Sequence, residues 1–174
     1  MSAGRKNNSH KKDYNTPPKY IKPVTDFFVK IYLDPCSNSY SLVNAQVNFI
    51  YPDKDGLKEE WNYPTIFVNP PYGRNSENKT SIYNWIQKGL EANQKYQSEI
   101  IYLIPVATNT KHFKDLIFKH FTSICFLADT RLKFYNQGKE DVKGAPMSCC
   151  LIYIGKRNKE FNAIFSNYGK IFNI

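Results

Sequence analysis

The sequence predicts a single α/β domain built on an open sheet, and three observations carry that prediction. Short apolar runs of strand length alternate with amphipathic segments that have helical spacing. The length of 174 residues is typical of one domain. A hydrophobic content of 41% with 16% aromatic residues is ample for a core, and it excludes the composition of disordered chains.

The chain is expected to begin with a basic arm. Residues 1–13 hold Arg5, Lys6, Lys11 and Lys12 among small and polar residues, without apolar periodicity. We expect a flexible arm at 1–13 and one domain over 14–174. A solubilising tail explains this arm as well as a DNA contact does.

The expected strands are six runs rich in β-branched and aromatic residues. The segment that precedes these runs contains Pro17, Pro18 and Pro23. We therefore expect it to form at most a short or broken helix through Phe27 and Phe28. The six runs are Ile31–Leu33, Val47–Ile50, Thr65–Val68, Ile100–Val106, Ser123–Ala128 and Cys149–Ile154.

Helices are expected wherever apolar residues recur three and four positions apart. One such stripe begins at Ile82 behind a possible Ser81 cap, and a second begins at Phe113. A last helical stripe runs from Phe161 to Phe172. The polar stretches 73–80 and 135–146 are expected to be surface loops.

The charge balance limits the possible partners. The chain has 24 Lys and Arg against 15 Asp and Glu, a formal charge of +9, which favours nucleic acid because bound phosphates release counterions. No apolar run reaches the roughly 18 to 20 residues of a spanning helix, and no hydrophobic signal segment is present. We therefore expect a cytoplasmic protein that binds nucleic acid and not a membrane.

Cysteine and histidine spacing predicts no metal site. Cys36, Cys125, Cys149 and Cys150 lack zinc-type spacing and are expected to be reduced thiols. The histidines, His10, His112 and His120, form no metal or nucleophile pattern and are expected to be structural or surface residues.

Polar residues follow three of the predicted strands, where open α/β sheets bind ligands. The first strand ends in Leu33-Asp34-Pro35-Cys36, and Asp53 and Asp55 follow the second. The third runs into Asn69-Pro70-Pro71-Tyr72. Asp34 could also cap the following turn, although cofactor contact is the favoured interpretation, and the pair Asp53 and Asp55 could belong to any β-turn.

The turn Asn69-Pro70-Pro71-Tyr72 is rigid and rich in acceptors, because its two prolines fix φ and remove two backbone donors. The Asn69 side-chain oxygen and the Pro70 carbonyl could accept both N–H groups of a nucleobase amine. The nitrogen lone pair would then be directed outward to attack a methyl sulfonium, without an essential general base. Tyr72 would stack on the base. A purely structural proline turn is the plainer alternative.

The chain resembles the short phage-type DNA N-6-adenine methyltransferase family from residue 14 to about 155. The resemblance lies in Asn15-Thr16-Pro17, Leu33-Asp34-Pro35-Cys36, Asp55-Gly56-Leu57 with Trp61, Val68-Asn69-Pro70-Pro71-Tyr72, Trp85, and Arg131-Leu132-Lys133-Phe134. It implies a Rossmann-like class I methyltransferase fold, with a mostly parallel sheet, a C-terminal antiparallel strand and one strand-helix unit missing. It also implies S-adenosylmethionine as cofactor and a flipped adenine in DNA as acceptor.

The same resemblance implies residue roles. Asn69, Pro70, Pro71 and Tyr72 correspond to the catalytic motif, and Phe134 is implied to stack on the base opposite Tyr72. The implied cofactor-binding residues are Asn15, Thr16 and Pro17 near the methionine end, Asp34 with Pro35 and Cys36 at its amino group, and Asp55, with Asp53 beside it, at its adenine. One departure is that 34–39 lacks the glycine-rich loop of larger methyltransferases.

Other side chains are assigned to DNA contact or to packing. Basic residues in the two loops beside the proposed pocket would contact phosphates, although a solvated face explains each one singly. Trp61 and Trp85 are expected in the core. The basic residues are Arg74, Arg131, Lys133, Lys139 and Lys143.

Several alternatives remain open at the level of sequence. The same turn serves enzymes that methylate RNA or protein glutamine, and DNA cytosine N4 is a nearer alternative. A non-catalytic DNA-binding module is a further class. The oligomeric state is open between monomer and homodimer.

Overall fold

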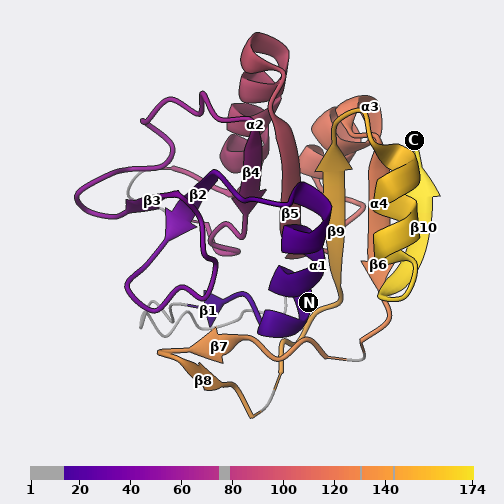
Figure 1. Ribbon diagram of the computed structural model, residues 1–174. Coiled ribbons are helices and arrows are strands. Elements are labelled where there is room, and N and C mark those ends of the chain that lie inside the picture. Colours follow the sequence, from indigo (N-terminus) through magenta and orange to yellow (C-terminus); the bar gives the residue numbers. More distant parts are fainter. Residues whose placement is uncertain (1–13, 75–78, 130, 143) are drawn as a thin grey trace, which may run out of the picture.

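The computed structural model describes residues 14–74, 79–129, 131–142 and 144–174. The expected arm at 1–13 and the candidate Lys143 lie outside these residues. At the centre is a seven-stranded sheet with the order β10-β6-β9-β5-β4-β2-β3 (Figure 1). Its strands are β2 (Leu33–Ser37), β3 (Val47–Ile50), β4 (Thr65–Val68), β5 (Glu99–Pro105), β6 (Ser123–Leu127), β9 (Cys149–Ile154) and β10 (Gly169–Asn173).

The sheet is mixed, so the expectation of a mostly parallel sheet was wrong. Strands β3, β2, β4 and β5 pair in parallel. Strand β9 lies antiparallel between β5 and β6, and β10 pairs antiparallel with β6. Half of the neighbouring pairs described in this sheet are therefore antiparallel, although the parallel half carries the candidate site.

Helices cover both faces of the sheet (Figure 1). One face is covered by α2 (Ile82–Tyr96) and by the π-helix η1 (His112–Ile117), which continues as α3 (Phe118–His120). The other face is covered by α1 (Pro18–Phe28) and α4 (Asn158–Phe165). Because both faces are covered, β4 and β9 are buried at every residue, which explains their continuous apolar runs.

Helix α1 differs from the prediction for the proline-containing segment before the first strand. It runs without a break over 11 residues and contains Pro23, although a short or broken helix was expected. An internal proline costs about 3 kcal/mol because it removes one helical hydrogen bond and crowds the preceding turn. Burial of Val24, Phe27 and Phe28 against the sheet offsets this cost.

The second difference from the predictions lies at the C-terminal apolar stripe, residues 161–172. The expected single helix over 161–172 ends at Phe165, and the chain returns as the edge strand β10. Gly169 starts that strand where a Cβ would lie 1.9 Å from the Phe126 carbonyl oxygen. Only glycine permits this approach, so the chain leaves the helix and pairs with β6.

A small three-stranded sheet stands beside the main one. It pairs β1 (Tyr14–Asn15) with β7 (Tyr135–Asn136), and β7 with β8 (Lys139–Glu140). The stretch 135–146, expected to be a surface loop, therefore contains two short strands. This pairing holds the start of the described chain next to the segment that follows Phe134.

The connections around β3 are short. Residues 38–46 and 51–64, which are described without a gap, contain no helix. The chain thus passes from β2 through β3 to β4 without a covering helix.

Candidate active site

Asn69 lies directly after β4, at the carboxyl edge of the parallel strands. Its side-chain nitrogen donates to the Thr16 hydroxyl at 3.1 Å and to the Tyr14 carbonyl at 3.4 Å. A backbone carbonyl can only accept, so the nitrogen must face Tyr14. Both amide hydrogens are used, and no hydrogen bond reaches the Asn69 oxygen from any described residue.

Two other residues of the motif, Pro70 and Tyr72, pack against the core. Pro70 is buried, whereas Pro71 is exposed. The Tyr72 hydroxyl donates to the Leu103 carbonyl of β5 at 3.1 Å, and burial raises the pKa of Tyr72 well above its ordinary value. The tyrosine is therefore a fixed, neutral ring beside Asn69.

Phe134 does not lie opposite Tyr72 with room for a base between them. The two rings touch edge to face, with 5.7 Å between their centroids and an angle of 77°. Phe134 is only 4% exposed and also contacts the Tyr14 ring at 5.7 Å. A base held between two aromatic faces would need those rings parallel and apart, so the expected sandwich is absent from this conformation.

The segment 15–17 packs against the loop that follows β2. Asn15 and Thr16 are 4% and 3% exposed, and Pro17 is also buried. The Asn15 amide nitrogen donates to the Tyr40 carbonyl at 3.0 Å, while the Asn38 amide nitrogen donates to the Asn15 oxygen at 2.7 Å. These contacts hold the candidate segment 15–17 against residues 38–40, which follow β2 and its candidate Asp34.

Asp34 is a buried carboxylate inside β2, at an irregularity in its pairing with β3. It accepts hydrogen bonds from the Cys36 amide at 3.0 Å and the Ser41 hydroxyl at 3.3 Å. No cation of the described chain pairs with it. Burial raises the pKa of Asp34 to about 6, and it also raises the pKa of the Cys36 thiol.

Asp55 lies against this segment through the glycine that follows it. A Cβ on Gly56 would lie 2.0 Å from the Pro35 carbonyl oxygen and 3.0 Å from the Trp85 ring. The Asp55 carboxylate accepts from the Leu57 amide at 3.1 Å and lies 3.5 Å from the Lys58 ammonium. Asp53 is exposed on the preceding turn, so the structure brings only Asp55 to the β2 end.

Gly56→Ala should therefore disturb the fold and the site together. The added methyl group must displace the Pro35 backbone, and we expect a loss of about 2 to 3 kcal/mol in the free energy of unfolding. Chemical denaturation measures this change. The matched control is Gly73→Ala, where a Cβ would meet nothing within 4 Å and stability should stay unchanged. Equal stability of the two variants would contradict the contact.

Both tryptophans lie in the core, and none of the four cysteines forms a disulfide. Trp61 and Trp85 are buried with ring centroids 6.2 Å apart, which confirms the packing prediction, and the Trp61 indole donates to the Gly56 carbonyl at 2.7 Å. The cysteines are unpaired. Within the described residues, no group of three or more His, Cys, Asp or Glu could hold a metal ion.

The basic candidates lie on the surface. Arg74, Arg131, Lys133 and Lys139 are exposed, and Lys133 forms a salt bridge with Glu140 at 3.2 Å across the β7 and β8 hairpin. Phosphate contact by these residues stays a prediction. Throughout the part of the chain that the structure describes, no helix has the length and apolarity needed to cross a membrane.

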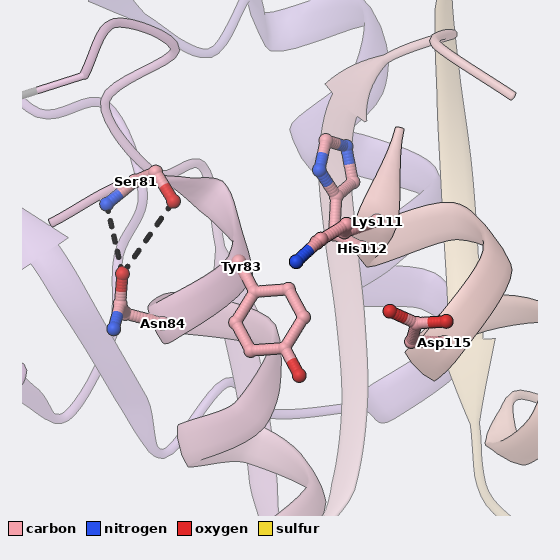
Figure 2. A pocket seen from close by; sticks show the side chains of 6 residues that line it. All are labelled: Ser81, Tyr83, Asn84, Lys111, His112 and Asp115. Carbon is pink, nitrogen blue, oxygen red and sulfur yellow. Dashed lines mark hydrogen bonds between the residues drawn. The ribbon is translucent and has the colours of Figure 1, made fainter. Parts of the chain in front are cut away.

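A polar hollow of about 500 Å³ opens between the starts of α2 and η1 (Figure 2). Sequence reasoning missed it, because its side chains come from two helices that follow different strands. It also missed Tyr14, Asn38 and Tyr40 beside Asn15 and Asn69, since single polar or aromatic residues in loops carry no signal. The hollow is lined by Ser81, Tyr83, Asn84, Lys111, His112 and Asp115.

Comparisons with known proteins agree on one family. A family model described as DNA N-6-adenine-methyltransferase (Dam) matches residues 4–171. The chain is 24% identical over 111 residues to a DNA N-6-adenine-methyltransferase of Haemophilus phage HP1 (strain HP1c1), a match that covers 63% of this chain and 58% of that relative. No solved structure matches. Since the family model spans nearly the whole sequence, the protein belongs to the DNA N-6-adenine-methyltransferase (Dam) family.

Proposed function

We propose that this protein transfers the methyl group of S-adenosylmethionine to the N6 amine of an adenine turned out of DNA. The observation that carries the proposal is the Asn69 carboxamide, whose nitrogen is held by Thr16 and Tyr14 while its oxygen has no donor from the described residues. Membership in the family supports adenine N6 as the acceptor. The positive charge of the chain supports DNA as the partner.

Asn69 and Pro70 together orient the amine. The Asn69 oxygen and the Pro70 carbonyl accept its two hydrogens, which directs the nitrogen lone pair away from the ring plane. The same two oxygens stabilise the positive charge that builds on nitrogen as the new bond forms. The methylated amine is then strongly acidic, so its extra proton passes to water and no side chain need act as a base.

Tyr72 supplies the stacking surface for the base. Its hydroxyl bond to Leu103 fixes the ring, so the ring face is oriented before the base arrives. Stacking of a base on an aromatic side chain contributes about 1 to 3 kcal/mol. Phe134 supports the Tyr72 ring from its edge.

The acidic segments fit the proposed cofactor. When bound, S-adenosylmethionine supplies an electrophilic methyl group on a positively charged sulfur. Asp34 suits the cofactor's ammonium group, because a buried carboxylate without a cation is costly until one arrives. Asp55 offers acceptor oxygens next to Pro35, and Asn15, Thr16 and Pro17 form the wall beside Asn69.

Cofactor affinity should depend on pH through Asp34. Its carboxyl is protonated below about pH 6, and only the charged form attracts an ammonium group. We expect the affinity for S-adenosylmethionine, measured by calorimetry, to fall roughly tenfold from pH 7 to pH 5. Asp34→Asn should bind weakly at both values, with a flat profile.

Stability provides the control for this variant. Because burial raises the pKa of Asp34 in the folded state, the charged form destabilises the fold above pH 6, and this cost disappears as the pH falls toward 4. Asp34→Asn should therefore be more stable than the wild type at pH 7, by about 2 kcal/mol, and equally stable below pH 4. Weak binding by an unstable variant would leave the assigned role without support.

The proposed reaction is tested by offering the purified chain and labelled cofactor to DNA, RNA and protein in parallel. Labelled methyl groups should appear only in DNA. Mass spectrometry of the digested DNA should then show N6-methyladenine and no N4-methylcytosine. Label confined to RNA or protein, or bound cofactor without transfer, would reject the proposal.

A further inference from the structure

The polar hollow lies on the edge of the sheet that carries Asn69. Its two walls are the starts of α2 and η1, which follow β4 and β5. Those strands are parallel, so both connections leave the sheet at the same edge. Tyr72, which also follows β4, is joined to β5 because its hydroxyl donates to the Leu103 carbonyl.

The lining side chains keep their hydrogen-bonding groups available. Lys111 and Asp115 stand four positions apart, the spacing at which such pairs commonly meet on helices, yet they form no ion pair. In Figure 2 the Lys111 ammonium and the Tyr83 ring turn toward each other, with Asp115 on the far side. None of these three has a hydrogen-bond partner in the described residues.

Asn84 and His112 have defined orientations. The Asn84 oxygen accepts from the Ser81 amide at 2.9 Å, and the Asn84 NH₂ group has no partner among the described residues. The Thr110 hydroxyl donates to the Ala107 carbonyl at 2.6 Å, so it must accept from His112 Nε2 at 3.1 Å. Burial lowers the pKa of His112, and the neutral ring keeps Nδ1 as an acceptor.

The backbone on one side is itself unusual. Residues His112–Ile117 form a π-helix, a rare geometry that occurs frequently at functional sites. It turns His112 and Asp115 to the hollow while Phe113, Leu116 and Ile117 stay buried in the core. The polar side chains are thus presented by a segment whose other face is fixed by packing.

We propose that the polar hollow holds one nucleobase of the substrate DNA close to the methylated adenine, a role that rests on the proposed function. The lining offers donors from Lys111 and Asn84, and acceptors from His112 and Asp115. The Watson–Crick edge of each base, which is accessible once that base is unpaired, presents donors and acceptors together. Because the charges of Lys111 and Asp115 cancel, the hollow suits an uncharged base better than a phosphate. The Tyr83 ring supplies a stacking face.

The test removes single bases from the DNA and leaves the protein unchanged. Duplexes with one methylatable adenine carry an abasic site at each neighbouring position in turn, which deletes the base and retains the phosphates. For the wild-type protein we expect kcat/KM to fall roughly tenfold or more at one position, and by less elsewhere.

Protein variants then locate the contact. Tyr83→Leu and Lys111→Met should each lower kcat/KM on intact DNA, and the abasic site at the sensitive position should cost these variants less than twofold more. Lys114→Met is the matched control, because Lys114 is an exposed residue of the same π-helix that does not line the hollow. It should keep the wild-type response. Unfolding midpoints confirm that the variants are folded.

The two proposals fail in different ways. Wild-type transfer to intact DNA without any base-sensitive position would overturn the role of the hollow and leave the proposed function standing. The same holds if a sensitive position exists but the hollow variants respond to it as the wild type does. No transfer to any intact duplex would overturn both.

Discussion

Asn69→Ala is expected to abolish methyl transfer while the protein still folds and binds S-adenosylmethionine. The substitution removes the side-chain oxygen that accepts one hydrogen of the amine, which is one of the two proposed acceptors that stabilise the transition state. Loss of one preorganised group of this kind costs roughly 10²- to 10³-fold in kcat. Single-turnover transfer to DNA measures the loss, and calorimetry should show cofactor affinity within a few fold of the wild type.

Asn69→Asp separates the roles of the two ends of the carboxamide. It keeps an acceptor oxygen for the amine, and its bond to Thr16 can reverse direction, with the Thr16 hydroxyl donating to the carboxylate. However, it places a second oxygen against the Tyr14 carbonyl, which also only accepts. Its activity should fall between those of the wild type and Asn69→Ala. Wild-type transfer by Asn69→Ala would disprove the mechanism.

Thr16→Val is expected to produce the second largest loss, because Thr16 orients Asn69. Valine keeps the shape of threonine but cannot accept the bond that the Asn69 nitrogen donates at 3.1 Å. The carboxamide is then held only by the longer bond to Tyr14 and can rotate its oxygen away from the base. We expect kcat to fall by roughly 10²-fold, comparable to the loss of one preorganised hydrogen bond.

The readout distinguishes this positioning role from direct cofactor contact. If Thr16 acts through Asn69, kcat falls while the dissociation constant of S-adenosylmethionine and the KM for DNA change little. Thr16→Ser retains the hydroxyl and should recover most of the rate. A loss confined to cofactor affinity would instead assign Thr16 to the cofactor, as the family resemblance implies.

Much of the sheet could be predicted from the sequence. The runs Val47–Ile50, Thr65–Val68 and Cys149–Ile154 are strands with the predicted bounds. Thr65–Val68 and Cys149–Ile154 were predictable because both faces of these strands are covered, which favours continuous apolar runs. Val47–Ile50 is an edge strand in which only Phe49 is buried, and its β-branched and aromatic residues indicated it. The predictions failed where local signals were outweighed, at Pro23 by burial of the helix and after Phe165 by pairing of β10 with β6.

The candidate site was predictable only in part, for the same reason. Asn69-Pro70-Pro71-Tyr72 stands out because its meaning is local: a proline-rich turn at the end of an apolar strand. Asp34 was predicted to follow a strand over Ile31–Leu33, but β2 begins at Leu33 and contains Asp34, because pairing with β3 extends this strand to Ser37. The polar hollow and the edge contact of Phe134 with Tyr72 join segments that share no pattern. No periodicity could have indicated that these side chains meet.

The sequence by itself determined a stiff turn rich in acceptors at residues 69–72, since two prolines after a buried strand fix the backbone wherever the turn lies. Tertiary structure decided what those residues touch. Asn69 receives its orientation from Thr16 and Tyr14, 53 and 55 positions earlier in the chain. Such partners depend on strand order and on the pairing of β1 with β7, which arise from packing over the whole sheet and not from the conformational preferences of neighbouring residues.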